Sequence, residues 1–110
     1  MLHVRLFCGA GMSTSLLAKK MQEYAAEKGI DAVVDAKPVS AIKQSSAEQL
    51  AEIDCALLGP QVAFERRVLG PYLDAAGVPW EVIPMQDYGM VRGDRVMQMA
   101  LDLIEAAKAK

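Results

Sequence analysis

The spacing of hydrophobic residues changes several times along the chain, and each change predicts a different element. Apolar and polar residues alternate from Leu2 to Phe7, which predicts a short strand. Helical spacing from near Thr14 predicts a helix that ends at Gly29, because the left-handed position after a helix favours glycine. The apolar run from Ile30 to Ala36 predicts a second strand. The chain therefore opens with the order strand, helix, strand.

The second half of the chain continues this alternation. Ser46 and Gln49 have the spacing of a capping box, which predicts a short helix from Ala47 to Glu52. The continuous apolar run from Cys55 to Leu58 is typical of a strand buried on both faces. The remaining predicted segments are a helix from Val62 to Val68, a break at Gly70-Pro71, a helical piece to Ala76, a strand from Trp80 to Ile83, a loop from Pro84 to Gly89 and a helix toward Lys108 that Asp94 caps.

Alternation of strands and helices predicts one α/β domain over residues 1–110. We expect a four-stranded parallel sheet of order 2-1-3-4 in three layers, with helices on both faces, similar to small Rossmann-like and low-molecular-weight phosphatase folds. Ligands of such sheets bind outside the carboxyl ends of the strands, where the strand order reverses. Cys8 ends the first strand at that point, and Gly59-Pro60-Gln61 would flank it.

The stretch Cys8-Gly9-Ala10-Gly11-Met12-Ser13-Thr14-Ser15 joins the first strand to the first helix. Glycines there let successive backbone N–H groups turn inward and hold an anion, and the hydroxyl groups of residues 13–15 add donors. The N-terminus of the predicted helix carries a partial positive charge, and this charge favours the thiolate of Cys8 over the thiol. We therefore expect Cys8 to be a nucleophile that carries a phosphoryl group, with Gly9 to Ser15 as a P-loop-like cradle for its oxygens.

Each part of this loop also has a simpler interpretation. A cysteine at a strand end is often only a small buried hydrophobe, and serine or threonine there often only caps the helix. The combination of one cysteine, two glycines and three hydroxyl groups at a strand-to-helix switch favours a functional loop. At the same edge, Gln61 and Tyr88 are candidates for contact with the loop or a partner, and helix-start packing explains Gln61 equally well.

Composition narrows the class of protein. The 110 residues are 53% hydrophobic and carry a net charge of −2, with no basic stripe, so nucleic acid is not an expected partner. No apolar run reaches the roughly 20 residues that span a bilayer, and the chain shows no secretory layout, so we expect a cytoplasmic protein. Cys8 and Cys55 are expected as free thiols, and no residue spacing indicates a metal site or a cofactor.

One missing residue argues against hydrolysis. Cysteine-dependent phosphatases of low molecular weight carry an arginine six positions after the cysteine, and this chain has Thr14 there. No arginine occurs between Arg5 and Arg66. A bidentate guanidinium is what clamps the transferring phosphoryl group in those enzymes. A loop that holds phosphate with amides and hydroxyl groups alone suits a carrier better.

The motifs resemble the IIB components of the bacterial phosphoenolpyruvate-dependent sugar phosphotransferase system, in the lactose/cellobiose (chitobiose) class. The resemblance lies in Cys8 to Ser15 with Leu16-Leu17, in Leu57-Leu58-Gly59-Pro60-Gln61-Val62 and in Asp87-Tyr88-Gly89, and it covers nearly the whole chain. It implies that Cys8 accepts phosphate from a histidine of a IIA protein. It also implies transfer to a sugar, a disaccharide such as cellobiose or lactose, held by a membrane IIC transporter. The protein would then be a protein-phosphocysteine–sugar phosphotransferase.

Two other classes stay open from the sequence. One is a cysteine-dependent phosphatase or arsenate reductase that uses the same Cys8. The other is a regulatory relative that keeps the fold with an idle loop.

Overall fold

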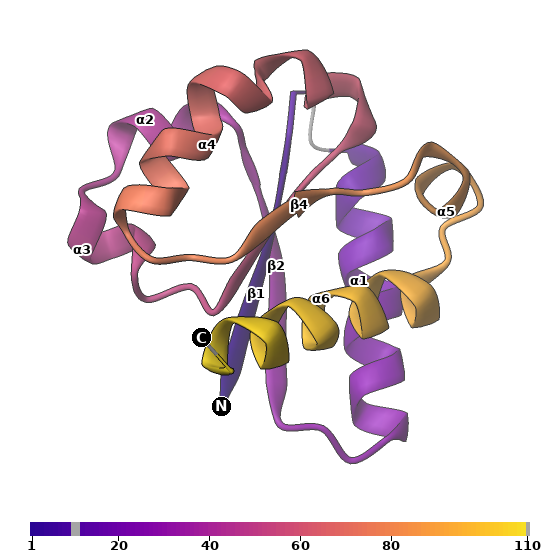
Figure 1. The fold of residues 1–110 in the computed structure, drawn as a ribbon. Helices are drawn as coiled ribbons and strands as arrows, with labels where there is room; N and C mark the ends of the chain where they lie inside the picture. The colour runs from indigo at the N-terminus through magenta and orange to yellow at the C-terminus, as the bar shows by residue number, and fades with distance from the viewer. Residues whose placement is uncertain (10–11, 110) are drawn as a thin grey trace.

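The computed structural model describes residues 1–9 and 12–109, with the side chains of residues 12–14 outside that description. Four parallel strands form one sheet of order β2-β1-β3-β4, which confirms the predicted order (Figure 1). The elements are β1 (Leu2–Cys8), α1 (Met12–Glu27), β2 (Ala32–Pro38), α2 (Ser40–Gln44), α3 (Ala47–Leu50), β3 (Cys55–Leu58), the 3-10 helix η1 (Pro60–Glu65), α4 (Arg66–Ala75), β4 (Trp80–Val82), α5 (Met85–Gly89) and α6 (Gly93–Lys108).

Strand β1 lies between β2 and β3, and the strand order of the sheet reverses at this strand. It pairs with β2 along its whole length, from Leu2 opposite Ala32 to Cys8 opposite Pro38. It pairs with β3 only as far as Phe7, which lies opposite Leu58. Cys8 is thus the last residue of the central strand and lies one residue beyond the last β1–β3 pair. This is the position at which open α/β sheets bind ligands.

Two hydrophobic cores lie on the two faces of the sheet. Helices α1 and α6 cover one face, where Val4, Leu6, Cys55 and Leu57 point inward. Segments α2, α3, η1 and α4 cover the other face over Phe7, Ala56 and Leu58. Figure 1 shows the two groups of helices on opposite sides of the strands. The predicted three-layer arrangement is therefore confirmed.

The second face is not covered along its whole width. His3 and Arg5 of β1 point to that face with Asp35 of β2, and all three side chains are only partly buried. Arg5 donates to both carboxylate oxygens of Asp35, from Nε at 2.9 Å and from Nη2 at 3.0 Å. His3 Nε2 lies 3.1 Å from the same carboxylate. The polar residues that alternate with the core residues of β1 therefore form a cluster on an open part of the sheet.

The predicted break at Gly70-Pro71 is wrong, because α4 continues through both residues. Pro71 lacks the N–H that would bond to the carbonyl of Arg67, but its ring is exposed and the other bonds of the helix remain. Gly70 does not break the helix but is required for its packing. A Cβ atom at Gly70 would lie 2.5 Å from Cζ2 of Trp80, so only glycine lets the indole of β4 lie against the helix.

Several boundaries also differ from the predictions. Two segments expected as connections are helical, namely α2 and α5, and β2 begins and ends two residues later than expected. Asp94 is not the N-cap of α6, since that position is Arg92, and its carboxylate instead accepts from Arg92 Nη2 at 3.1 Å. The capping box of Ser46 and Gln49 and the left-handed Gly29, with φ of 69°, are confirmed.

Candidate functional site

Cys8 lies at the carboxyl edge of the sheet but is not open to solvent. Only 2% of the residue is exposed. By strand alternation its side chain is on the face of Val4 and Leu6, toward α1. Its carbonyl accepts from the N–H of Val39 at 3.0 Å, which fixes the backbone at this point. The expected role of Cys8 as a nucleophile needs an accessible sulfur, whereas the structure buries this residue.

Helix α1 begins at Met12, two residues earlier than predicted. Ser13, Thr14 and Ser15 therefore lie within the first turn of the helix, and none of them stands at the position before it where a cap would lie. The first four N–H groups of a helix have no partner inside the helix, and they carry its positive dipole end. This 16-residue helix thus directs that end toward the segment that follows Cys8.

The predicted phosphate-binding residues are only partly covered by the structure. Gly9 is described as a bend after β1, and Ser15 is exposed on α1. Ala10 and Gly11 lie outside the described residues, as do the side chains of Met12, Ser13 and Thr14. A cradle formed by residues 9–15 remains a prediction.

The segment after β3 forms one wall beside Cys8. A Cβ atom on Gly59 would lie 3.5 Å from Cβ of Cys8 and 2.8 Å from Oε1 of Gln61. The side chain of Gln61 therefore folds back over Gly59, next to the cysteine. A Cβ atom on Gly9 would lie 3.7 Å from Cγ1 of Val62, so η1 also borders the start of the loop. These contacts bring Gln61 to the candidate site from a distant part of the sequence.

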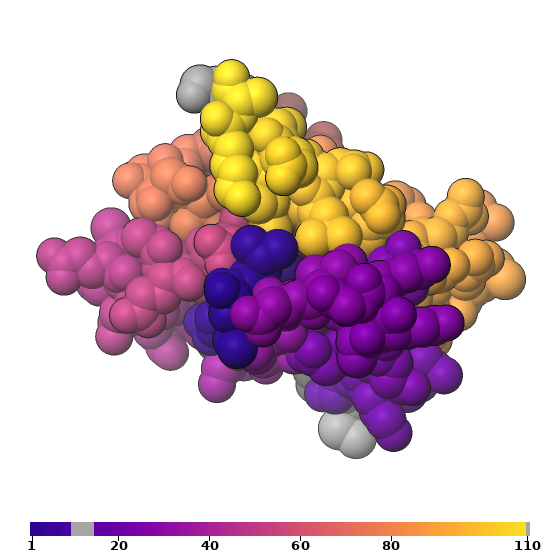
Figure 2. Space-filling model, turned by 90° about the horizontal axis from the view of Figure 1, so that it is seen from below, coloured from indigo at the N-terminus to yellow at the C-terminus, as the bar shows by residue number. Residues whose placement is uncertain are grey.

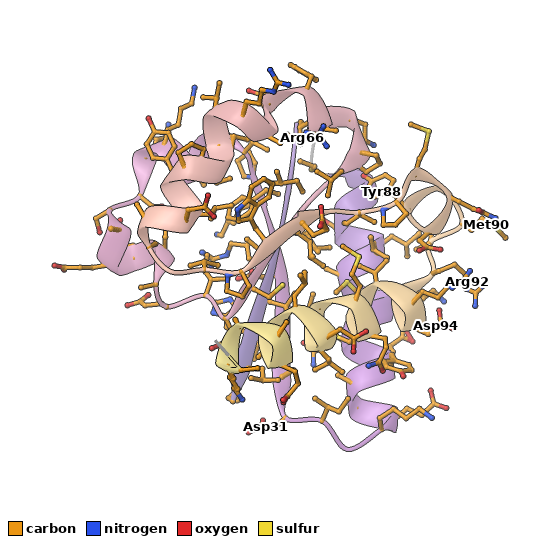
Figure 3. All side chains as sticks on the ribbon, viewed as in Figure 1. Asp31, Arg66, Tyr88, Met90, Arg92 and Asp94 are labelled. Atoms are coloured by element: carbon orange, nitrogen blue, oxygen red, sulfur yellow. The ribbon has the colours of Figure 1, made fainter. Side chains whose placement is uncertain are left out.

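Tyr88 and Asp87 lie on α5 at the same end of the molecule. Tyr88 is half-buried and packs against the core that α1 and α6 form (Figure 3). Oδ1 of Asp87 lies 3.6 Å from Nη1 of Arg95, and its carbonyl accepts from the N–H of Arg92 at 2.9 Å. Asp87 therefore fastens α5 to α6, a role that the sequence pattern did not indicate.

Arg5 is not available as a phosphate clamp. It is bonded to Asp35 through two nitrogens and points to the sheet face opposite that of Cys8. Partial burial by itself raises the pKa of Asp35, but hydrogen bonds from Arg5 and His3 and their charges outweigh it, so the pKa lies below its usual value. The arginine closest to Cys8 in the sequence thus stabilises the sheet.

The two cysteines have different surroundings. Cys55 is fully buried, and burial together with the charge of Asp54 raises the pKa of its thiol to about 12. Cys55 pairs with Val4 in the sheet, four residues before Cys8, and neither cysteine is in a disulfide. Cys55 is therefore a core residue, and Cys8, at the carboxyl edge of the sheet, remains the candidate nucleophile. Among the described residues, no three His, Cys, Asp or Glu side chains are grouped so that they could hold a metal ion.

Figure 2 views the amino ends of the strands, where the first residues of β1 lie beside the end of α6. Within residues 1–9 and 12–109, no helix is long and apolar enough to cross a membrane.

The sequence of this chain is similar to those of known proteins. Residues 3–99 match the family model described as PTS system, Lactose/Cellobiose specific IIB subunit. The galactose-specific EIIB component of the PTS system of Lactococcus lactis subsp. cremoris is 48% identical over 102 residues, covering 92% of this chain and 94% of the relative. The cellobiose-specific EIIB component of Lactococcus lactis subsp. lactis is 47% identical with the same coverage.

Solved structures agree with this relationship. The solution structure of a cellobiose-specific phosphotransferase IIB component from Borrelia burgdorferi has a TM-score of 0.77 and 33% identity, and the match covers 96% of this chain and 94% of that one. A YwlE mutant from Bacillus subtilis has a TM-score of 0.52 and 13% identity over 99% and 98% of the chains, which shows a shared fold alone. The chain therefore belongs to the lactose/cellobiose-specific IIB subunits of the sugar phosphotransferase system.

Proposed function

We propose that Cys8 is the phosphoryl carrier of this IIB subunit. It accepts the phosphoryl group from a histidine of a IIA protein and donates it to a sugar, a disaccharide such as cellobiose or lactose, held by a membrane IIC transporter. The observation that supports this most is the position of Cys8, the last residue of the central strand, just ahead of the N-terminus of α1. The proposal places the protein in the cytoplasm, with transient contact at the inner face of the membrane through IIC.

The first transfer begins when the Cys8 thiol loses its proton to water. The thiolate attacks the phosphorus of the phosphohistidine, so an S–P bond forms and the N–P bond breaks. The electron pair of that bond returns to the ring nitrogen, and a proton on the other nitrogen lets the imidazole leave as a neutral group. Backbone N–H groups of residues 9–15 and the dipole of α1 would stabilise the charge on the three phosphoryl oxygens.

The second transfer reverses the role of the sulfur. A sugar hydroxyl oxygen attacks phosphorus, an O–P bond forms, and the S–P bond breaks with its electron pair on the Cys8 thiolate. The hydroxyl proton passes to a base of the acceptor site or to water. No metal or organic cofactor of this chain is needed in either step. Because Arg5 is bound to Asp35, the proposal includes no guanidinium that would speed hydrolysis.

Intact-mass measurement tests the proposal. The native protein, incubated with phosphorylated IIA, should gain the mass of one phosphoryl group, and Cys8→Ala should gain none. Cys55→Ala is the matched control, because it removes the other sulfur from the core and should still be phosphorylated. No gain in the native protein, or a gain that persists in Cys8→Ala, would refute the proposal. Steady release of phosphate from a simple aryl phosphate, abolished in Cys8→Ala, would favour a phosphatase instead.

A further inference from the structure

Gly59 follows β3 and lies beside Cys8, but its backbone conformation does not require glycine. Its φ is −63° and its ψ is 148°, which is the extended conformation that a residue before proline favours. Every amino acid can adopt these angles without strain. The N–H of Gly59 donates to the carbonyl of Phe7 at 2.8 Å, which holds the residue in place. What glycine provides here is therefore the space that a side chain would fill.

The amide group of Gln61 occupies this space. A Cβ atom on Gly59 would lie 2.8 Å from Oε1 of Gln61, closer than such atoms approach in folded proteins. The same Cβ atom would lie 3.5 Å from Cβ of Cys8 and 3.6 Å from the carbonyl oxygen of Phe7, which are ordinary contact distances. Of these three atoms, only the flexible end of Gln61 would have to move. The absence of a side chain at Gly59 thus keeps the amide beside Cys8.

The Gln61 amide has unused hydrogen-bonding capacity at this place. The side chain is exposed, and it makes no hydrogen bond to another residue in the part of the chain that the structure describes. An amide offers two N–H donors and one carbonyl acceptor, and a half-turn of the group exchanges the sides to which they point. A group that becomes anionic next to the amide can therefore receive a hydrogen bond from it without any change in the backbone.

Resting on the proposed function, we infer that Gln61 is a ligand of the phosphoryl group on Cys8. After transfer, the amide turns so that Nε2 donates a hydrogen bond to one of the three phosphoryl oxygens. Gly59 is a positioning residue, because the space over its Cα atom holds the amide at the start of the loop. Gln61 lies on η1. It thus adds a side-chain donor from outside the loop to the backbone N–H groups of the proposed cradle.

A neutral donor suits a phosphoryl group that must leave again. A guanidinium holds phosphate through two charge-assisted hydrogen bonds, whereas an amide contributes one hydrogen bond and no charge. Arg5 is already bonded to Asp35 through two nitrogens and does not fill this role. The amide therefore stabilises the phosphocysteine moderately, which favours its formation and still allows the next transfer. Loss of the amide should shift the equilibrium of transfer back toward the phosphorylated donor.

This equilibrium tests the inference. Phosphorylated IIA is mixed with the native protein or a variant, and intact masses give the amounts of both proteins with and without phosphate, before free phosphate appears. Gln61→Ala should lower the equilibrium constant for phosphocysteine formation by about tenfold, the effect of losing one hydrogen bond to a charged group. Gln61→Glu should lower it at least as much, because a carboxylate repels the phosphoryl oxygens. A weaker contact with IIA would slow both directions of transfer and leave this constant unchanged.

Gly59→Ala tests the positioning role. The new Cβ atom should push the amide aside and lower the constant about as far as Gln61→Ala does. The double variant should fall no further than either single variant, because both changes remove the same hydrogen bond. Gln44→Ala is the matched control, since Gln44 is an exposed glutamine on α2 and its loss should leave the constant within about twofold. Melting of Gln61→Ala should stay close to that of the native protein, because the side chain is exposed.

The outcomes separate this inference from the proposed function. If the native protein gains no phosphoryl group, the proposed function fails, and the role of Gln61 with it. If the native protein is phosphorylated but Gln61→Ala keeps the native equilibrium constant, only the inference is overturned. Slower transfer at an unchanged constant would assign Gln61 to contact with IIA and overturn it too. Effects of Gly59→Ala and Gln61→Ala that multiply in the double variant would overturn the role of Gly59. If Gly59→Ala does not fold, the two variants of Gln61 still decide.

Discussion

At the scale of residues, the cluster of Asp35, Arg5 and His3 links protonation to stability. The pKa of Asp35 is lower in the folded protein than its ordinary value of 3.8. A carboxyl group with a lowered folded pKa stabilises the fold above its unfolded pKa, and the contribution disappears as the pH falls through the folded value. The cluster therefore stabilises the protein at neutral pH and not in strong acid.

Asp35→Asn should lower the free energy of unfolding at pH 7 by about 1 kcal/mol, a modest figure because a third of the side chain remains in water. The deficit should narrow as the pH is lowered below 4, where the native carboxyl group becomes protonated too. Urea unfolding from pH 7 to pH 3 measures this difference in the free energy of unfolding. Glu48 is exposed, and Glu48→Gln serves as the control. A deficit that stays constant across this range would contradict the pKa assignment.

Single residues differ in how far the sequence alone could assign them. The motif around Cys8 predicts its place at the end of β1, because a strand end, glycines and a helix start are all local features, and its chemistry stays a prediction. Contacts between distant residues are not local. Nothing in the sequence indicates that Arg5 of β1 is bound to Asp35 of β2. The burial of Cys8 also depends on the packing of several segments, so the sequence pattern led to an open thiol.

At the scale of elements, the contact between α1 and α6 depends on Gly93. A Cβ atom there would lie 2.6 Å from the carbonyl carbon of Lys20 and 2.8 Å from the backbone nitrogen of Met21. Backbone atoms of a helix cannot move aside as a side chain can. Gly93→Ala should therefore separate the helices and lower the free energy of unfolding by about 1–3 kcal/mol or more.

Gly89→Ala is the matched control for this substitution. An added Cβ at Gly89 meets nothing within 4 Å, and Gly89 is the last residue of α5. Alanine there should be neutral or should stabilise the protein by up to about 1 kcal/mol. Urea unfolding of both variants at neutral pH gives the comparison. Equal stability of the two variants would show that the contact of α1 with α6 is looser than the distances indicate.

Elements with a strong local signal were predictable, and short or interrupted ones were not. The capping box of Ser46 and Gln49 was sufficient to predict α3, and the apolar run from Cys55 to Leu58 was sufficient to predict β3. Gly70-Pro71 is a strong breaking signal, but α4 continues because the helix packs its glycine on Trp80 and leaves the proline exposed. The five-residue helices α2 and α5 have too few turns to produce a periodic pattern.

At the scale of the whole molecule, the Gln22 side chain protects the edge of the sheet that β2 forms. Strand β2 lies at the edge, and its even-numbered residues direct their backbone groups away from β1. Gln22 of α1 donates from Nε2 to the carbonyl of Ala32 at 2.7 Å, and its Oε1 accepts from the N–H of Val34 at 2.9 Å. The amide thus takes the place that the backbone of another strand would occupy. Such protection limits edge-to-edge association between copies.

Gln22→Ala should remove this protection. Two partly buried backbone groups lose their partner, so the free energy of unfolding should fall by about 1–2 kcal/mol. Ala32 and Val34 then present a free carbonyl and a free N–H to another chain, and a second copy can pair along β2.

Light scattering during mild heating and size-exclusion chromatography at rising concentration should detect larger species sooner than in the native protein. Gln98→Ala removes an exposed glutamine that bonds only to Asp102 among the described residues and should change neither measurement. If Gln22→Ala behaves like Gln98→Ala, the edge of β2 is kept from pairing by something other than this amide.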